Sequence, residues 1–254
     1  MSIKQDVQLC SKLMGKARST VVLSGAGMST ASGIPDFRGP EGLYSGKNGP
    51  TMESIFELES FVENPAVFYD FYRRFLSVVD RATPTYTHRF LAAMERESLL
   101  FGIVTQNIDA LHQKAGSRAV YEIHGSIWTS RCLHCGREYD YKTSKKMAFS
   151  NQTPYCSCRG LIKPDIVFFG EEVRHLRECM DMAKKSDLFL VLGSSLTVAP
   201  ASYLPSMCHG TVIIVNKGNI PFTSSIVGPK TLLMNYDLDT FFSTLNEELK
   251  LPIR

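Results

Sequence analysis

Four cysteines in two closely spaced pairs form the clearest set of metal ligands in this sequence. Two residues separate Cys132 from Cys135, one separates Cys156 from Cys158, and twenty lie between the pairs. Four thiolates in two such pairs suit tetrahedral zinc, and the spacing is close to that of a zinc ribbon. Because four protein ligands leave no open position for a substrate, we expect a structural site.

A histidine inside the first pair and the shortness of the second pair leave the ligand geometry open. His134 is the alternative ligand, although we expect the four cysteines to bind the metal. One residue fewer between Cys156 and Cys158 tightens the turn that presents their thiolates. The stretch around the pairs has little apolar content, so we expect the bound metal to hold it folded.

A glycine turn directly after a short apolar run predicts a phosphate-binding loop. Residues 21–23 predict a buried strand, and Gly25 and Gly27 follow at once, permitting a tight turn and close approach of a pyrophosphate. Ser29 or Thr30 could cap the helix expected next, or bind the ligand. Such a glycine pair also occurs in ordinary turns, and Thr30 occupies the third glycine position of the usual dinucleotide fingerprint.

Small and polar residues end or follow five apolar runs of the chain. The runs at 21–23, 101–105, 187–192, 211–215 and 231–234 predict strands, and these residues are Ser24, Gly25, Thr105, Gln106, Gly193, Ser194, Asn216 and Asn235. Because the carboxyl ends of parallel strands meet at one edge of an open α/β sheet, we expect a polar edge that binds a dinucleotide. By spacing alone, a surface loop explains the polar residues at 106–109 equally well.

One histidine follows a short predicted strand and precedes a glycine. Residues 120–123 predict that strand, and it delivers His124 with little room to pack before Gly125. An isolated histidine is usually structural, but this position predicts an exposed, reactive imidazole that could act as a general base. His88, at the start of a predicted helix over 88–100, is expected to be a surface or satisfied buried histidine. A strand-like run over 166–169 ends at Gly170.

The composition is that of an ordinary globular protein. The chain has 254 residues, 44% hydrophobic and 21% charged, with a net charge of +3. The slight charge gives no indication of nucleic-acid binding. No apolar run approaches a membrane span, and the first twenty residues do not resemble a signal peptide, so we expect a cytoplasmic protein. In that compartment the seven cysteines are thiols or metal ligands, and Cys10, Cys179 and Cys208 are small buried hydrophobes.

These elements together predict an α/β fold, a Rossmann-like parallel sheet domain with a smaller inserted zinc-ribbon and helical domain. The Rossmann-like domain is expected at residues 1–40, 85–130 and 165–254. A helical insertion at 41–84 and a zinc-binding ribbon at 131–164 would form the small domain. The helices over 51–80 are rich in aromatic residues, which we expect to fill a helical layer: Phe56, Phe61, Phe68, Tyr69, Phe71, Tyr72 and Phe75.

Three longer motifs together resemble the sirtuin family, the NAD-dependent protein lysine deacylases. They are the string over 21–38, the string Thr-Gln-Asn-Ile-Asp-x-Leu-His-x-x-Ala-Gly over 105–116, and the pair His124-Gly125. The resemblance extends from about residue 19 to residue 237 and is closest to bacterial-type deacetylases. At Lys163 the family pattern has an arginine, which is a conservative difference.

The resemblance implies a role for each matching residue. NAD would be bound by Gly25, Ala26, Gly27, Thr30, Phe37, Arg38, Gln106, Asn107, Ile108, Asp109, Ser194, Ser195, Asn216 and Asp237. Catalysis would use His124 as general base, with Asn107 and Asp109 in the nicotinamide pocket, and Phe37 would block return of the freed nicotinamide. An acyl-lysine peptide would add as a strand along Val167, Phe168, Phe169, Gly170 and Glu171.

The implied reaction releases nicotinamide from NAD and moves the acyl group of an acyl-lysine to ADP-ribose. Sirtuins that remove acidic acyl groups share a Tyr-x-x-Arg pair, whereas here Tyr69 is followed by Tyr72 and then Arg73, which favours acetyl or another neutral group. The alternative with the same NAD site is a mono-ADP-ribosyltransferase. A non-catalytic NAD sensor, a zinc-ribbon interaction module and a dehydrogenase fit less well. The expected partners are acyl-lysine proteins or peptides, without nucleic acid or membrane; the oligomeric state stays open and is compatible with a monomer.

Overall fold

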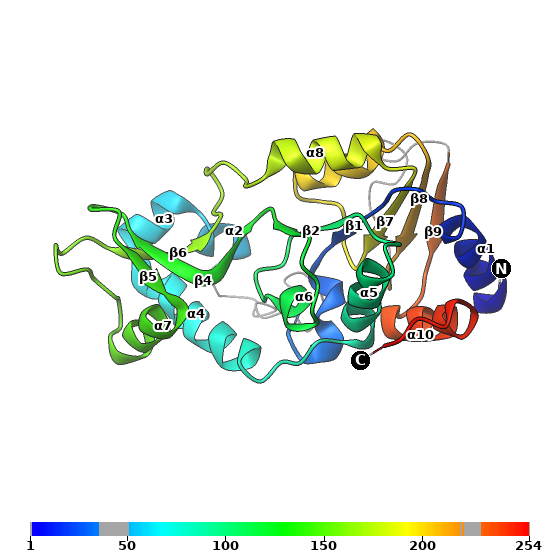
Figure 1. The fold of residues 1–254 in the computed structure, drawn as a ribbon. Coiled ribbons are helices and arrows are strands. Elements are labelled where there is room, and N and C mark those ends of the chain that lie inside the picture. The colour runs from blue at the N-terminus through cyan, green and yellow to red at the C-terminus, as the bar shows by residue number, and fades with distance from the viewer. Residues whose placement is uncertain (1, 36–50, 219, 221–229, 254) are drawn as a thin grey trace.

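The computed structural model of the chain describes residues 2–35, 51–218, 220 and 230–253. These residues form two lobes that lie side by side (Figure 1). A parallel sheet with helices on both faces makes up the larger lobe. The small lobe contains a three-stranded antiparallel sheet and four helices. Within the described residues, no helix combines the length and the apolar content that a membrane span requires.

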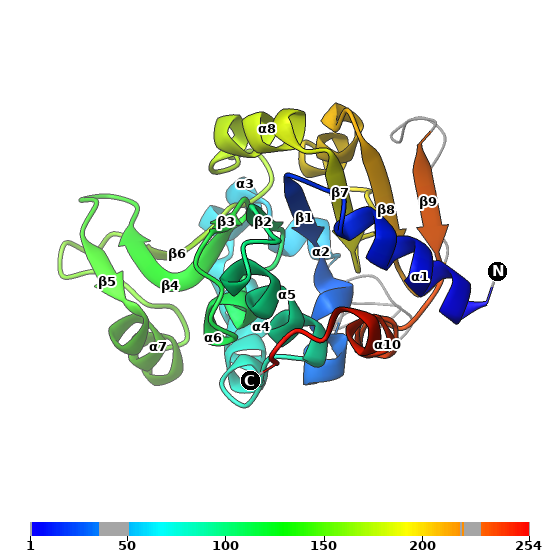
Figure 2. The ribbon, with the colours of Figure 1, turned by 45° about the vertical axis from the view of Figure 1, so that its right-hand side comes forward.

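The larger lobe is built on a six-stranded sheet in which every neighbouring pair of strands is parallel. Its strands, in chain order, are β1 (Thr20–Ser24), β2 (Gly102–Thr105), β3 (Val120–Glu122), β7 (Leu188–Leu192), β8 (Thr211–Val215) and β9 (Thr231–Met234). Their order in the sheet is β3-β2-β1-β7-β8-β9 (Figure 2), which is the doubly wound order of dinucleotide-binding folds. The order reverses between β1 and β7, so the predicted fold class is confirmed.

Helices bury both faces of this sheet. On one face α1 (Ile3–Met14), α5 (Tyr86–Arg96) and α10 (Leu238–Leu249) cover Val22, Leu190 and Ile213. On the other face α8 (Leu176–Lys185) and the 3₁₀ helix η3 (Ala201–Met207) cover Leu23 and Val191. Alternate residues of a strand point to opposite faces, so a strand covered on both sides needs a continuous apolar run. This requirement explains why the sequence predicted these strands correctly.

The small lobe packs three helices against the antiparallel sheet. The helices are α2 (Met52–Ile55), α3 (Leu58–Glu63) and α4 (Pro65–Val79); the strands are β4 (Gly125–Cys132), β5 (Glu138–Asp140) and β6 (Ile162–Ile166), with α7 (Tyr141–Ser150) following β5. The aromatic layer predicted for these helices is confirmed, because all seven rings are buried. Edge-to-face contacts such as that between Phe61 and Phe168, with ring centroids 5.3 Å apart, join the helices to the segment after β6.

Two expectations of local structure are wrong. The glycine turn after β1 leads into two 3₁₀ turns, Ala26–Met28 and Thr30–Ser32, rather than an α-helix, because Gly33 ends the second turn in a left-handed conformation. The strand expected over 166–169 covers Ile162–Ile166 instead. Pairing with β4 decides its extent, and that ladder includes Lys163 and Pro164, whose residue types gave no strand signal. The predicted domain boundaries stay a prediction.

Candidate active site

A cleft of about 1060 Å³ lies between the carboxyl edge of the parallel sheet and the small lobe. Residues that follow β1, β2, β7, β8 and β9 form one wall, and Phe56 and the segment after β6 form the other. Ligands of open α/β sheets bind at this edge, next to the point where the strand order reverses. The predicted polar strand ends therefore come together around one cavity.

Most predicted cofactor, catalytic and substrate residues line this cleft. They are Gly25, Ala26, Gly27, Thr30, Gln106, Asn107, Ile108, His124, Val167, Phe168, Phe169, Gly170, Glu171, Ser194, Ser195, Asn216 and Asp237. Asp109 lies behind the wall, 4% exposed and hydrogen-bonded to Ser29. Phe37 and Arg38 lie outside the described residues. The individual roles of all these residues stay predictions.

Gly25 and Gly27, in the turn after β1, have no room for a side chain, because the turn at Gly193 lies against them. A Cβ atom on Gly25 would lie 2.8 Å from the carbonyl oxygen of Gly193, and one on Gly27 would lie 2.8 Å from the Gly193 Cα. The N–H groups of Gly25 and Gly27 donate to the carbonyls of Leu192 and Gly193, at 3.0 and 2.9 Å. These two N–H groups therefore join β1 to β7, and the predicted close approach of a pyrophosphate to the same glycines stays a prediction.

One hydrogen bond fixes which nitrogen of His124 can accept a proton. Its Nδ1 lies 3.2 Å from the carbonyl oxygen of Gln106, and a carbonyl only accepts, so Nδ1–H is the donor. Nε2 is then the basic nitrogen of a side chain that lines the cleft. Burial lowers the pKa of His124 and the Gln106 carbonyl opposes this, so the imidazole is neutral near pH 7. The ring is half-buried, less exposed than the sequence predicted.

Asn107 is held by hydrogen bonds from its amide group. Its Nδ2 donates to the carbonyl oxygen of Gly25 at 3.1 Å and to Ser29 Oγ at 3.2 Å. Ser29 Oγ in turn donates to Asp109 Oδ2 at 2.6 Å, and Asp109 Oδ1 accepts from the N–H of Leu111 at 2.9 Å. Burial raises the pKa of Asp109 while these two donors lower it. The acid thus orients Ser29, which orients Asn107.

A buried chain of hydrogen bonds supports the backbone at Asn107. The N–H of Asn107 donates to Thr105 Oγ1 at 3.1 Å, Ser24 Oγ lies 2.9 Å from the same oxygen, and His112 Nε2 lies 2.8 Å from Ser24 Oγ. Burial holds the pKa of His112 well below 6.5, so this histidine is neutral. The sequence did not assign a role to Ser24, Thr105 or His112 individually, because the partners lie 81 and 88 residues apart.

His88 lies beside His112 in the same buried region. The ring centroids are 4.7 Å apart, and His88 Nδ1 lies 2.8 Å from Thr85 Oγ1 at the start of α5. Burial lowers the pKa of His88 to about 3. His88 is therefore buried, one of the two expected alternatives, but it is not fully satisfied, because its Nε2 has no hydrogen-bond partner in the part of the chain that the structure describes.

The four predicted metal ligands converge in the small lobe. The Sγ atoms of Cys132, Cys135, Cys156 and Cys158 all lie within 4.8 Å of one another, with separations of 3.5 Å for Cys132–Cys158 and 3.6 Å for Cys135–Cys156. Tetrahedral zinc with Zn–S bonds of about 2.3 Å needs sulfur separations of about 3.8 Å, so the set fits zinc. His134 is exposed and lies outside this group, and the short second pair does not prevent convergence.

Neighbouring groups shift the pKa values of these cysteines in both directions. The backbone N–H of Cys158, followed by the Tyr139 hydroxyl, lowers the pKa of Cys156 to about 5. Against the Gly160 N–H, burial and the other three thiols raise the pKa of Cys158 to about 12, so this cysteine would release its proton when it binds the metal. The cluster lies outside the cleft, in agreement with the predicted structural role.

Several residues that line the cleft were not predicted. They include Phe56, Thr197, Val198, Lys217 and Tyr236. Gly193, which the sequence named only as part of the edge of the sheet, lines the cleft too. Tyr236 follows a strand end, a signal that could have identified it. Phe56 comes from the small lobe, and nothing in the sequence indicates that it lies across the cleft from residues that follow the strands of the parallel sheet.

A family model described as Sir2 family matches residues 25–200 of the sequence. The chain belongs to the Sir2 family. It is 39% identical over 242 residues to an NAD-dependent protein deacetylase of Thermotoga maritima, which covers 93% of this chain and 95% of that protein. It is 44% identical over 209 residues to an NAD-dependent protein deacetylase of Saccharolobus solfataricus, covering 81% of this chain and 83% of the relative. The predicted sirtuin resemblance is confirmed.

Solved Sir2 structures share the fold over nearly the whole chain. A Sir2 protein with a deacetylated p53 peptide and 3′-O-acetyl ADP ribose has a TM-score of 0.89 and 37% identity, covering 97% of this chain and 99% of that one. A Sir2–p53 peptide–NAD⁺ structure has a TM-score of 0.84 and 38% identity, covering 98% of this chain and 99% of that one.

Proposed function

We propose that this Sir2 protein is an NAD-dependent protein lysine deacylase, which transfers the acyl group of acyl-lysine to ADP-ribose and releases nicotinamide. The observation that carries the proposal is the position of His124. Its neutral imidazole lines a cleft that is walled by strand ends suited to NAD and by the segment suited to a peptide. A protein that only bound NAD would have no need of a base there. The names of the relatives support the same activity.

The first step of this reaction would use the group around Asn107. Nicotinamide is a poor leaving group in relaxed NAD, so a pocket that holds it in a strained orientation favours its departure. Asn107 and Ile108 would form this pocket, with Asp109 and Ser29 fixing the Asn107 amide. The acyl oxygen of the peptide would then attack the ribose carbon that nicotinamide leaves.

The second step would use His124 as base. Its Nε2 would take a proton from a ribose hydroxyl, which allows the 2′-oxygen to attack the carbon of the former acyl carbonyl. Lysine would leave as the amine with the proton that His124 took up. A water molecule would then add to the carbon joined to the 1′- and 2′-oxygens, one of these C–O bonds would break, and the acyl group would remain as an ester on ADP-ribose. General-base assistance is typically worth about 10²–10⁴-fold. The zinc centre would hold the small lobe folded and take no part in these steps.

A neutral acyl group fits the small lobe better than an acidic one. Tyr69 and Tyr72 are each 1% exposed, and the Tyr69 hydroxyl donates to the carbonyl oxygen of Ile162. Arg73 donates to the carbonyls of Ala148 and Gln152. The two tyrosines are therefore core residues and Arg73 is bound by backbone carbonyls, so we propose acetyl or another neutral acyl group as substrate.

The test is to incubate the protein with NAD and acetyl-, propionyl- or succinyl-lysine peptides and to identify products by mass spectrometry. We expect equal amounts of nicotinamide and acyl-ADP-ribose for the neutral peptides, and little product from the succinyl peptide. ADP-ribose attached to protein, without deacylated lysine, would favour the mono-ADP-ribosyltransferase instead.

The variant His124→Ala tests the assignment of the base. We expect turnover to fall by about 10²–10⁴-fold while the Kd for NAD changes little, because Gln106 and the strand ends remain. His209→Ala is the matched control, since His209 is exposed and lies outside the cleft. Full activity in His124→Ala would show that another group is the base.

The proposed partners are acyl-lysine proteins or peptides, and the proposed location is the cytoplasm, where thiol ligands for zinc persist. The expected lack of nucleic-acid and membrane binding, and the oligomeric state, stay predictions.

A further inference from the structure

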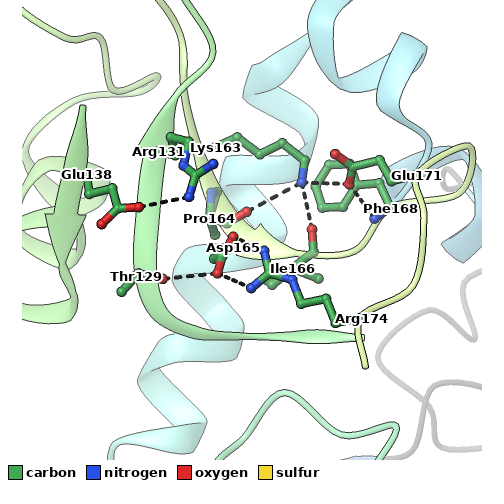
Figure 3. A network of polar contacts seen from close by, with 10 residues as sticks. All are labelled: Thr129, Arg131, Glu138, Lys163, Pro164, Asp165, Ile166, Phe168, Glu171 and Arg174. Carbon is green, nitrogen blue, oxygen red and sulfur yellow. Dashed lines mark hydrogen bonds and ion pairs between the residues drawn. The ribbon is translucent and has the colours of Figure 1, made fainter. Parts of the chain in front are cut away.

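A buried lysine lies directly behind the predicted peptide-binding segment. The Lys163 side chain on β6 is 7% exposed, and its Nζ lies 2.6 Å from the carbonyl oxygen of Ile166 and 2.8 Å from Glu171 Oε2 (Figure 3). The same ammonium group lies 4.1 Å from the centre of the Phe168 ring. Burial lowers the pKa of Lys163, and Glu171 opposes that shift. Moving an ammonium group from water into the protein interior costs free energy, and these contacts offset that cost.

The segment from residue 167 to residue 171 is closed into a loop by this lysine. Ile166 precedes the segment and Glu171 ends it, and Lys163 binds both. Glu171 Oε2 also accepts from the N–H of Phe168 at 2.7 Å, so one carboxylate oxygen joins the lysine to the backbone of the loop. A second ion pair, between Asp165 and Arg174, closes the loop further out (Figure 3).

The closed loop is anchored in the small lobe by the Phe168 ring. Phe168 is 1% exposed and packs against Phe61 and Phe68, with ring centroids 5.3 and 5.0 Å apart. The N–H of Glu171 donates to the carbonyl oxygen of Phe168 at 3.0 Å, so the chain turns after this buried ring. Phe169, the next residue, is 45% exposed. Lys163 itself is not among the residues that line the cleft.

The loop is also bonded to both sides of the cleft. The N–H of Val167 donates to the carbonyl oxygen of His124 at 2.8 Å, and that of Phe169 donates to the carbonyl oxygen of Phe56 at 2.6 Å. A peptide that adds as a strand binds through main-chain groups, so the backbone of the loop must be held still before the peptide arrives.

We propose that Lys163 is a positioning residue for the acyl-lysine peptide, and that its contacts with Ile166, Phe168 and Glu171 hold the segment 167–171 in its peptide-binding shape. This role rests on the proposed deacylase function. This chain has lysine at position 163, where the family pattern has arginine, so the difference falls on a residue with a specific role. The planar guanidinium group of an arginine would have to make the same contacts with a different shape.

The test compares Lys163→Met with the wild-type protein in steady-state kinetics. We expect KM for an acetyl-lysine peptide to rise by roughly 10- to 100-fold, the size expected for losing hydrogen bonds to a charged group. The Kd of a labelled peptide, measured by fluorescence anisotropy, should rise by the same factor. The Kd for NAD and kcat should stay within about twofold, because Lys163 contacts none of the cleft residues that follow the strands of the parallel sheet. Lys163→Arg should recover part of the loss.

Arg131→Gln is the matched control. Arg131 is the cross-strand partner of Lys163 on β4, and its ion pair with Glu138 is exposed, at 58% and 65% for the two side chains. This variant removes a neighbouring cation of the same network, yet we expect it to leave KM unchanged because an exposed ion pair contributes little.

A variant that unfolds the lobe would also raise KM, so folding is measured separately. Lys163→Met leaves Glu171 unpaired, whereas Lys163→Met with Glu171→Gln leaves no buried charge and should be the more stable of the two. Zinc content and the emission of Trp128 report whether the lobe is folded. The double variant should be folded and still show the raised peptide KM.

Two outcomes separate the proposals. A folded Lys163→Met protein with wild-type KM and peptide Kd would overturn the positioning role and leave the deacylase function intact. A wild-type protein that forms no acyl-ADP-ribose from any peptide would contradict the deacylase function and this role with it.

Discussion

A backbone carbonyl selects the tautomer of His124, and a pair of side chains selects the orientation of Asn107. The sequence predicted both residues because each follows a strand end in a recognisable motif. It could not predict the partners that orient them. Ser29 and Asp109 lie 80 residues apart, and their contact exists only once β1 and β2 are paired. No role was predicted for Lys163 for a similar reason, because lysine in place of the family's arginine is a conservative difference by residue type alone.

The pH dependence of turnover tests the state of His124. Because burial lowers its pKa below 6.5, most of the imidazole is neutral at pH 6.5, and protonation removes the base as the pH falls further. We expect the acid-side inflection of kcat/KM for an acetyl peptide to lie below pH 6.5. An inflection above pH 6.5 would mean that a nearby carboxylate, rather than burial, controls the imidazole.

The glycine after His124 provides a second test at the level of single residues. Gly125 and Gly136 have the same φ of 72°, but a Cβ atom on Gly125 would overlap the carbonyl oxygen of Asp165, whereas nothing lies within 4 Å at Gly136. Gly136→Ala should lower the free energy of unfolding by about 1–2 kcal/mol, because alanine is disfavoured in the left-handed conformation. Gly125→Ala should lower it by roughly 1–3 kcal/mol more, because β4 and β6 must also separate. Urea unfolding of the pair measures the difference, and equal losses would contradict the close contact.

Among the elements, central parallel strands were the most predictable. Residues 188–192 form β7 and are fully buried, so burial on both faces demanded a continuous apolar run. The small lobe was less predictable, because partner strands decide its pattern. β6 contains Lys163 and Pro164, and it forms only because β4 pairs with it. The helix expected after β1 failed because too few residues separate the glycine turn from Gly33 for an α-helix.

Metal removal should unfold the elements around the four cysteines first. The single tryptophan of the chain, Trp128, lies on β4 and packs edge-to-face on Tyr141, 5.3 Å between ring centroids. A strong zinc chelator should shift its emission to longer wavelength and abolish deacylation, and added zinc should reverse both changes. Cys135→Ser should resemble the chelated protein, whereas Cys208→Ala, away from the cluster, should not. An unchanged spectrum after confirmed zinc loss would mean that the lobe folds without metal.

At the scale of the whole molecule, the sequence predicted an α/β fold with an inserted lobe, and the main-sheet order of dinucleotide-binding folds agrees. Apolar periodicity identified the strands, but their order follows from which helices cover which face, and those contacts are long-range. The family resemblance supplied the combination of NAD and peptide sites, because no local pattern connects the strand ends near residue 106 with the loop at 167–171. In space these parts face each other across one cleft.

The chain passes from the parallel sheet to the antiparallel sheet at residues 123 and 124, between β3 and β4. His124 is therefore bonded to both bodies, through Nδ1 to Gln106 on one side and through its carbonyl oxygen to Val167 on the other. Any hinge motion that parts the lobes must strain or break one of these bonds. The proposed base and the proposed peptide segment are thus tied through one residue, which keeps the distance between them constant.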